Sequence, residues 1–315
     1  MGKFVSYVPR KNKNVILVSS LHDDDAIDPR SEAQNKPEMI TFYNETKSGV
    51  DTADQMCATF SVCRNVRRWP MEFHTNENVS MDIIGGKEAT PHSRPYMAFI
   101  QPALCGGALI RPKWILTAAH CNVNSTSYAI LGAHRLDDTH KQVLRIKQGI
   151  KHPNFKWGIW INDLQLLELE KPAKLNKFVA LLPLPKNEEV IQAGKICSTA
   201  GWGRTDVKIL SDVLLEVNLT IVGNEDCEKK YRKIDQPIIS SMMCAGAPNN
   251  NRKAGTCYGD SGGPLICDGK YVGLVSFGHP NCDPEFPGGY TRLTIYYLHW
   301  IRNTINRDYS EIYTT

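Results

Sequence analysis

The stretch GDSGGP, residues 259–264, decides the fold of most of this chain when it is taken together with LTAAHC at 116–121 and NDLQLL at 162–167. These stretches carry Ser261, His120 and Asp163. Acyl transfer at an amide needs a nucleophile, a base that takes its proton and a group that orients the base, and a hydroxyl, an imidazole and a carboxylate fill these roles. One such residue alone is usually an ordinary surface, turn or loop residue. All three inside extended motifs predict nucleophilic catalysis by Ser261.

Further motifs extend this pattern through the rest of residues 83–315. They are IIGGKEATPHSRPYMAFIQ (83–101), LGAHRL (131–136), PAKLNKFVALLPLP (172–185), TAGWG (199–203) and SDVLLEV (211–217). With these motifs the segment resembles the trypsin-like, chymotrypsin-fold serine proteases along its whole length. Within that family it is most similar to the granzyme and mast-cell protease branch, in particular granzyme K and granzyme A. The resemblance implies a serine endopeptidase that works through an acyl-enzyme.

The fold that this resemblance implies is all-β: two antiparallel six-stranded barrels, with the catalytic residues at their junction, followed by a C-terminal helix. The local pattern agrees, because YYLHWIRNTINR, residues 296–307, repeats apolar residues at helical spacing. In this fold Ser261 is the nucleophile, His120 the general base and then acid, and Asp163 the residue that fixes the imidazole. The backbone N–H groups of Gly259 and Ser261 are expected to form the oxyanion hole.

Substrate preference is expected to depend on a pocket beside the nucleophile. Gly255 stands six residues before Ser261, where trypsin-like members, including granzymes K and A, hold an aspartate for Arg or Lys. Burying an unpaired cation there is costly, whereas an aromatic side chain gains from burial. We therefore predict cleavage after Phe, Tyr, Leu or Met, although Asp283, Glu285 and the His279-Pro280 insertion lie near the pocket in sequence and could change its chemistry. The expected substrate-binding residues are Gly255, Thr256, Ser276, Phe277, Gly278 and Gly288.

The motif that begins at Ile83 predicts a zymogen. In this family cleavage frees an α-ammonium, here that of Ile83, which pairs with the carboxylate beside the nucleophile, here Asp260. Trypsin-type activation needs Arg or Lys before Ile83, but Met81-Asp82 stands there. Granzymes carry such an acid-ended dipeptide, which a dipeptidyl peptidase removes, and we expect that activator here.

Eight of the ten cysteines lie after Ile83, which predicts disulfides and an oxidising compartment. The resemblance implies the pairs Cys105–Cys121, Cys197–Cys267, Cys227–Cys244 and Cys257–Cys282, and a secreted or granule-stored protein. Asn124 and Asn218 are then candidates for glycosylation. The chain as written shows no signal peptide, since its longest early apolar run, residues 15–18, is too short, and no stretch is long enough for a membrane span.

Residues 1–71 follow a different pattern. KPEMITFYNETKSGVDTADQMCATF (36–60) and RRWPM (67–71) resemble the piggyBac DNA transposases, which implies part of an RNase-H-like fold. Asp51, with Asp54, matches the last of three metal-binding carboxylates, but two-metal catalysis needs all three. We therefore expect an incomplete, inactive fragment with free thiols at Cys57 and Cys63. In it NVILVSSL (14–21) and residues 36–44 predict strands, and a helix is expected from Thr52. Residues 72–82 form a junction that ends in the activation dipeptide.

Charge differs between the two parts. Residues 1–82 have 10 basic and 12 acidic residues, whereas residues 83–315 have 27 and 21. The basic excess favours sulfated glycans as partners, besides protein or peptide substrates, with about equal weight for an ordinary solvated surface. Specific nucleic-acid and membrane binding are not expected. Neither is a cofactor or metal, because the loop after LGAHRL lacks the spaced acids of a calcium site, and Pro287 replaces the aromatic of sodium-responsive members.

Two other functions remain open at this point. The first is a catalytically silent protease-fold binding protein, which the complete set of His120, Asp163, Ser261, Gly259 and Asp260 argues against. The second is a DNA-binding fusion tethered by the transposase-like part. That part is incomplete, and residues 1–82 together have 10 basic and 12 acidic residues, so they would bind phosphates poorly.

Overall fold

The computed structural model divides the chain into two compact units, Met1–Asn76 and Glu77–Thr315. It describes residues 3–10 and 13–19 of the first unit, and residues 85–204, 210–247, 254–283 and 285–312 of the second. Several predictions from the sequence lie outside the described residues: the strand at 36–44, the helix from Thr52, Asp51, Asp54, Cys57, Cys63, and the activation segment Met81, Asp82 and Ile83.

The described part of the first unit is a hairpin of two antiparallel strands, β1 (Lys3–Arg10) and β2 (Lys13–Ser19), with Lys3 opposite Ser19. The run of β-branched and apolar residues at 15–18 accounts for β2, which begins and ends slightly earlier than the predicted strand at 14–21. The partner strand β1 was not predicted, since its apolar residues are interrupted by Ser6 and Pro9.

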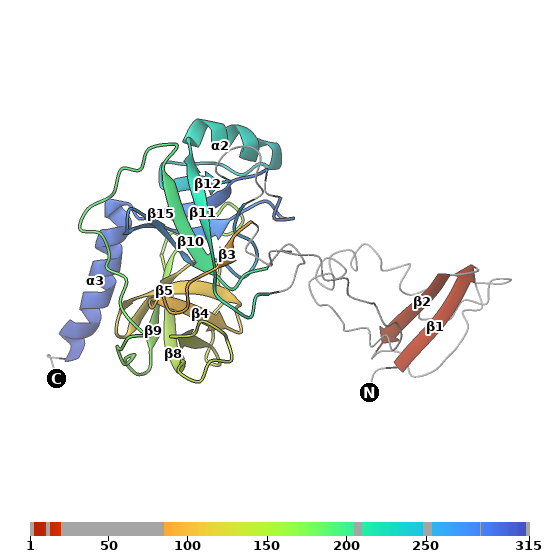
Figure 1. The fold of residues 1–315 in the computed structure, drawn as a ribbon, viewed down its shortest axis with the longest axis horizontal. Helices are drawn as coiled ribbons and strands as arrows, with labels where there is room; N and C mark the ends of the chain where they lie inside the picture. Colours follow the sequence, from red (N-terminus) through yellow and green to blue (C-terminus); the bar gives the residue numbers. More distant parts are fainter. Residues whose placement is uncertain are drawn as a thin grey trace. The chain divides into compact units, whose positions relative to one another are not determined.

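The second unit begins with a closed six-stranded antiparallel barrel (Figure 1). Leu109, Leu116, Leu131 and Leu166 are fully buried and help fill its core. Around the barrel the strands follow the order β4-β5-β6-β9-β8-β7. Their bounds are β4 Met97–Gln101, β5 Cys105–Arg111, β6 Trp114–Thr117, β7 Tyr128–Leu131, β8 Gln142–Lys151 and β9 Gln165–Leu169.

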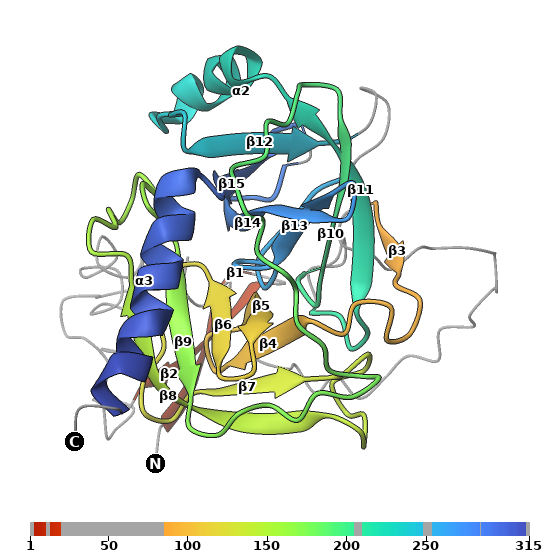
Figure 2. The ribbon, with the colours of Figure 1, turned by 90° about the vertical axis from the view of Figure 1, so that its left-hand side faces the viewer.

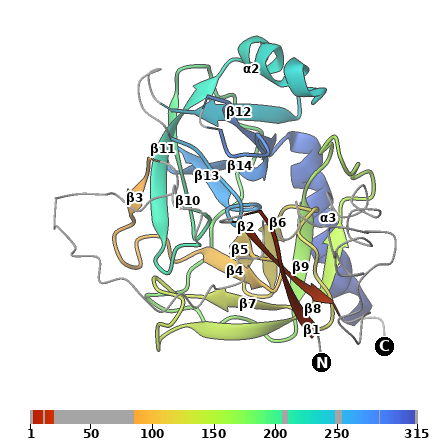
Figure 3. The same ribbon diagram turned by 90° about the vertical axis from the view of Figure 1, so that its right-hand side faces the viewer.

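A second six-stranded barrel follows, in which a pairing between β10 and β11 closes the order β10-β13-β14-β15-β12-β11. Its bounds are β10 Ile196–Gly201, β11 Leu215–Val222, β12 Met242–Gly246, β13 Pro264–Cys267, β14 Lys270–Phe277 and β15 Gly288–Arg292. Along β11 every second residue from Leu215 to Ile221 is buried, as expected for a strand with one face in the core. The short strand β3 (Lys87–Glu88) pairs with Leu215 and Glu216 at the start of β11, before the residues that pair with β12 (Figure 3).

Helices are few. The helix α2 (Asn224–Tyr231) continues into a 3₁₀ turn, η2 (Arg232–Ile234), at the outer end of the second barrel (Figure 1). The C-terminal helix α3 spans Ile295–Ile312, longer at both ends than the predicted 296–307. It follows β15 of the second barrel and runs alongside the first (Figure 2), because Tyr297, Leu298, Ile301 and Ile305 lie at helical spacing and pack into the first barrel's core.

The predicted two-barrel, all-β fold with a C-terminal helix is therefore confirmed. Four disulfides link the same pairs that the resemblance implies: Cys105–Cys121, Cys197–Cys267, Cys227–Cys244 and Cys257–Cys282. Within the described parts of the chain, no helix has the length and apolar character needed to cross a membrane.

Candidate active site

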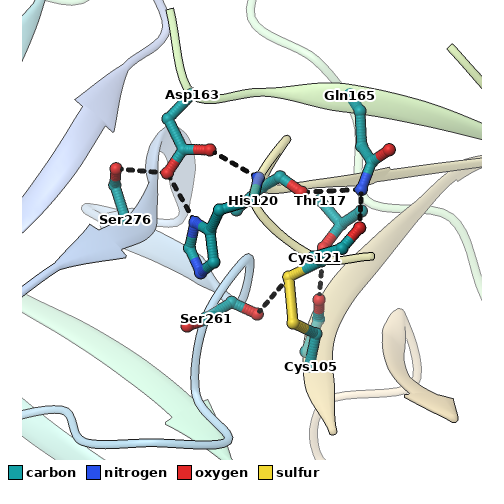
Figure 4. Close-up of a disulfide and its surroundings, with 10 residues drawn as sticks. Cys105, Thr117, His120, Cys121, Asp163, Gln165, Ser261 and Ser276 are labelled. Carbon is teal, nitrogen blue, oxygen red and sulfur yellow. Dashed lines mark hydrogen bonds and ion pairs between the residues drawn. A yellow bond between two sulfur atoms is a disulfide. The ribbon is translucent and has the colours of Figure 1, made fainter. Parts of the chain in front are cut away.

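The carboxylate of Asp163 lies at the centre of the candidate site. Asp163 is fully buried at the middle of a tight turn, in which the N–H of Leu164 donates to the carbonyl of Asn162 at 2.9 Å, just before β9 begins. Its Oδ1 accepts a hydrogen bond from the backbone N–H of His120 at 2.9 Å. Its Oδ2 accepts from His120 Nδ1 at 2.7 Å and from the Ser276 hydroxyl at 2.6 Å (Figure 4).

The loop that carries His120 follows β6 in the first barrel. Gln165, which begins β9, donates from its side-chain amide to the carbonyls of Ala118 (2.7 Å) and Cys121 (2.6 Å). The backbone on both sides of His120 is thereby fixed. Because a carboxylate only accepts hydrogen bonds, Nδ1 of the neutral imidazole carries the proton, and Nε2 offers a lone pair. His120 can then take a proton at Nε2.

Ser261 comes from the second barrel, where it lies in the loop before β13. Figure 4 shows Ser261 on the side of the His120 ring opposite Asp163, next to the Cys105–Cys121 disulfide. The N–H of Gly106, in β5 of the first barrel, donates to the carbonyl of Ser261 at 2.8 Å and holds the two barrels together at this point. The structure thus brings His120, Asp163 and Ser261 together at the junction of the barrels.

Two backbone N–H groups beside Ser261 are free to bind an anion. Among the described residues, the amides of Gly259 and Ser261 donate to no acceptor. Gly259 has φ +99°, and a Cβ there would lie 2.8 Å from Cα of Gly203 and 2.9 Å from a methyl of Leu210. Only glycine fits this backbone and this space.

The glycines expected to bind substrate differ in the space around them. A Cβ added at Gly255 or at Gly278 would meet no described atom within 4 Å. At Gly288, by contrast, it would lie 2.9 Å from the Thr256 hydroxyl. The Phe277 ring is buried against Gly289 and the Tyr231 ring.

Asp283, His279 and Pro280, which lie near this region in sequence, make contacts within or close to their own loop. The Asp283 carboxylate accepts from the N–H of Glu285 at 3.0 Å. The His279 ring stacks on Phe286 at 4.4 Å between centroids, and the carbonyl of Pro280 accepts from the Tyr258 hydroxyl at 2.9 Å. No described atom of this insertion lies within 4 Å of a Cβ added at Gly255.

Asp260, which lies between Gly259 and Ser261, the two residues expected to form the oxyanion hole, is fully buried. Its carboxylate accepts hydrogen bonds from the amides of Gly203 and Cys257, both at 3.0 Å. Burial raises the pKa of Asp260 to about 7, against the opposing effect of these two hydrogen bonds. A Cβ at Gly203 would lie 2.4 Å from the carboxyl carbon, so the glycine of TAGWG makes room for the acid.

Comparison with known proteins identifies the scaffold. Residues 83–301 match the family model described as Trypsin. The chain is 42% identical over 229 residues to granzyme A of Bos taurus, an alignment that covers 71% of this chain and 88% of the relative. It is 40% identical over 234 residues to mast cell protease 3 of Ovis aries (71% and 90% covered), and 38% identical over 235 residues to granzyme H of Homo sapiens (72% and 92% covered).

The chain belongs to the trypsin family. It is a trypsin-like serine endopeptidase related to granzymes and mast cell proteases. Residues 4–77 match a second family model, described as Transposase IS4, which supports the interpretation of the first part as a transposase fragment. This second match extends past Met71, where the sequence motifs end.

Within this trypsin-family site, sequence reasoning missed several supporting side chains. Ser276 was expected only in the strand that binds substrate, but its hydroxyl donates to Asp163. Gln165 fixes the His120 loop, and Thr291 donates from its hydroxyl to the carbonyl of Asp163 at 3.0 Å. The motif NDLQLL contains Gln165, and a buried amide within a strand of leucines was the one signal available for it.

A metal centre finds no support at this position. In the described part of the trypsin-family domain, the one cluster of metal-ligand residue types consists of Cys105, His120 and Cys121. The two sulfurs are joined in a disulfide, so neither is a thiolate that could bind a metal.

Proposed function

We propose that this serine endopeptidase cleaves peptide bonds after large uncharged residues, through Ser261, once Ile83 has become its N-terminus. The observation that carries the mechanism is the buried Asp163 carboxylate, which accepts from both the backbone N–H and Nδ1 of His120. This pairing directs the basic Nε2 away from Asp163, to the side where Ser261 lies (Figure 4).

The reaction proceeds in two halves. His120 takes the proton of the Ser261 hydroxyl as Oγ attacks the scissile carbonyl, and the amides of Gly259 and Ser261 bind the resulting oxyanion. The imidazolium, stabilised by Asp163, then gives its proton to the leaving amine as the C–N bond breaks. Water attacks the acyl-enzyme by the same route, which releases the acid and restores the hydroxyl of Ser261.

The space at Gly255, where an added Cβ would meet no described atom within 4 Å, supports the preference for Phe, Tyr, Leu or Met before the scissile bond. An arginine or lysine there would lose its hydration without gaining a described carboxylate, whereas an apolar side chain gains roughly 25 cal/mol for each Å² it buries. Thr256, Gly278 and Gly288 are proposed as the walls. Ser276, Phe277 and Gly278 form the strand that pairs with the substrate backbone.

A panel of peptide substrates that differ only in this residue tests the specificity. We expect kcat/KM for Phe or Leu to exceed that for Arg by at least 100-fold, and Gly255→Asp to reverse the order, because the new carboxylate would pair with the guanidinium. The variant keeps His120, Asp163, Ser261 and all the disulfide cysteines. Its activity on Arg substrates would therefore show that the substitution changes specificity and does not damage the catalytic residues. Faster cleavage after Arg by the unaltered protein would contradict the proposal.

Labelling by a fluorophosphonate probe tests the catalytic assignment separately. The protein that begins at Ile83 should be labelled, and Ser261→Ala should not be. Absence of labelling in the correctly folded, released protein would instead favour a silent protease-fold binding protein.

The remaining assignments follow the relatives and the sequence. We propose a secreted or granule-stored protein with residues 83–315 as the protease, residues 72–82 as the junction, and residues 1–71 as an inactive transposase fragment. Sulfated glycans are the weaker of its proposed partners: in the cluster at 229–233, Lys229 pairs with Asp226 and Arg232 with Glu228, each at 3.0 Å. Such pairing leaves less positive charge for a polyanion.

A further inference from the structure

The residue before the catalytic aspartate has an unusual backbone. Asn162 has φ +57°, in the left-handed region that asparagine tolerates better than most residues. Asp163 is the next residue and occupies the middle of the tight turn described above, so the backbone angles of Asn162 set the direction in which the Asp163 carboxylate points. Whatever holds Asn162 therefore also orients Asp163.

The side-chain amide of Asn162 is held at both ends. Its Nδ2 donates to the carbonyl of Asn154 at 2.7 Å, which ties it to the start of the same loop. Its Oδ1 accepts from the hydroxyl of Tyr297 at 2.7 Å. Tyr297 lies on α3, 135 residues further along the chain. The loop of the first barrel is thus anchored to the C-terminal helix.

The Tyr297 ring is itself fixed. Tyr297 is 1% exposed, and its ring packs edge-on against the buried imidazole of His152 at 5.4 Å between centroids. The backbone N–H of His152 donates to the carbonyl of Leu164, directly after Asp163, at 3.0 Å. A second C-terminal contact, from the Thr291 hydroxyl, reaches the carbonyl of Asp163 itself.

We propose that Tyr297 is a positioning residue for the catalytic step, acting on Asp163 through the amide of Asn162. This inference rests on the proposed role of Asp163. Tyr297 does not touch the reacting atoms. Its hydroxyl keeps Asn162 left-handed, and this holds the Asp163 carboxylate where both His120 bonds form. Loss of the hydroxyl lets the turn relax and misaligns the imidazole with Ser261.

Tyr297→Phe tests the proposal, because it keeps the buried ring and removes only the hydroxyl. We expect kcat to fall about 10- to 100-fold with KM unchanged, since small misplacements of catalytic groups cost rate rather than binding. Tyr296→Phe is the matched control: Tyr296 is the neighbouring residue on α3, its ring also contacts His152, and it is 56% exposed. Its kcat should not change.

A double-mutant cycle separates positioning from general damage. In an Asp163→Asn background, Tyr297→Phe should cause no further loss, because the group that it positions is already disabled. Rates are normalised to the concentration of folded protein, because a variant without Asp163 would react too slowly with a fluorophosphonate to be titrated. Asn162→Ala removes the acceptor of the same hydrogen bond and should lower kcat by a similar factor. This variant tests the proposal if Tyr297→Phe does not fold.

Two results would overturn the inference: an unchanged kcat in Tyr297→Phe, or an equal loss with and without Asp163. Neither affects the proposed function, since Asp163→Asn would still be nearly inactive. Full activity of Asp163→Asn, by contrast, would refute the proposed catalytic residues themselves.

Discussion

Single residues at this site are constrained by more than their chemistry, and Gly259 is the sharpest case. Its N–H is proposed to bind the oxyanion, yet its φ of +99° and its distance to Gly203 also exclude any side chain. The catalytic role and the backbone role therefore coincide in one glycine.

Gly259→Ala should lower the rate of the chemical step without weakening substrate binding. The added methyl cannot fit against Gly203 and Leu210 without turning the peptide, so the oxyanion loses a donor. Loss of one donor typically costs about 100- to 1000-fold in kcat. We expect a fall of that size with KM nearly unchanged, measured on the preferred peptide substrate. Gly269→Ala, also at positive φ but with no described atom within 4 Å of its Cβ, is the control for backbone strain alone. An equal loss in both variants would contradict the assignment.

The sequence could predict those site residues that lie within short continuous motifs. His120, Asp163 and Ser261 each lie in a short motif, and so do the residues proposed for the oxyanion hole. Thr291 and Tyr297 could not be assigned, because their hydroxyls act on residues 128 and 135 positions away. No local pattern encodes a contact that exists only after the two barrels have assembled.

At the scale of elements, His152 joins the loop before Asp163 to α3. Its ring is 1% exposed and lies among Tyr296, Tyr297 and Trp300, with centroids 5.0–5.5 Å away. Among the described residues its Nε2 has no hydrogen-bond partner. Burial lowers the pKa of His152 below its ordinary value of 6.5.

This histidine should make the fold sensitive to acid. Below pH 6.5 the unfolded chain takes up a proton at His152 while the folded protein resists it, so stability falls as the pH drops toward the lowered folded pKa. His152→Phe should remove this component. We expect thermal melting between pH 7 and pH 5 to show a smaller decrease for the variant than for the unaltered protein. His140→Phe changes an exposed histidine and serves as the control. Identical decreases in His152→Phe and the unaltered protein would refute the role of His152.

The ends of helices and strands were also harder to predict from the sequence, because they depend on contacts between distant parts of the chain. The C-terminal helix was predicted from its apolar spacing, which marks the buried face but not the ends, and α3 extends beyond 296–307 on both sides. The strand β3 has only two residues and was not anticipated, because it exists through pairing with β11 rather than through its own pattern.

At the scale of the whole molecule, the motifs of the sequence predicted the two barrels. The buried residue Asp260 gives a physical reason why release of the N-terminus at Ile83 would affect activity. Asp260 is buried next to the proposed oxyanion hole, and burial raises its pKa to about 7 despite the two backbone hydrogen bonds that favour the charged form. A carboxylate in this position needs a cation to remain ionised at neutral pH. The proposed partner is the α-ammonium that Ile83 gains on cleavage, and it would fix the backbone on both sides of Ser261.

Release of Ile83 should therefore switch the enzyme on. We expect the protein that begins at Ile83 to exceed the full chain in kcat/KM by about 10²- to 10⁴-fold, the rate equivalent of losing one partner of a buried ion pair, about 3–5 kcal/mol. A protein that begins at Met81 should stay inactive until a dipeptidyl peptidase removes two residues. Asp260→Asn should be inactive whether or not Ile83 is released, and equal activity of the full and released chains would contradict the mechanism.

The pH dependence of the free energy of unfolding should show whether Ile83 and Asp260 form an ion pair. Without a cation, folded Asp260 holds its proton up to about pH 7 while the unfolded carboxyl releases it near 3.8, so the unreleased protein loses stability as pH rises through this window. Pairing with Ile83 lowers the pKa of Asp260 and should reverse that slope in the released protein. Denaturant unfolding at pH 4.5 and pH 7 measures the difference, and Asp260→Asn should abolish it. If the free energy of unfolding varies with pH in the same way for the two proteins, Ile83 and Asp260 do not pair. Pairing with an ammonium would lower the pKa of the buried carboxyl group and so change the pH dependence of stability.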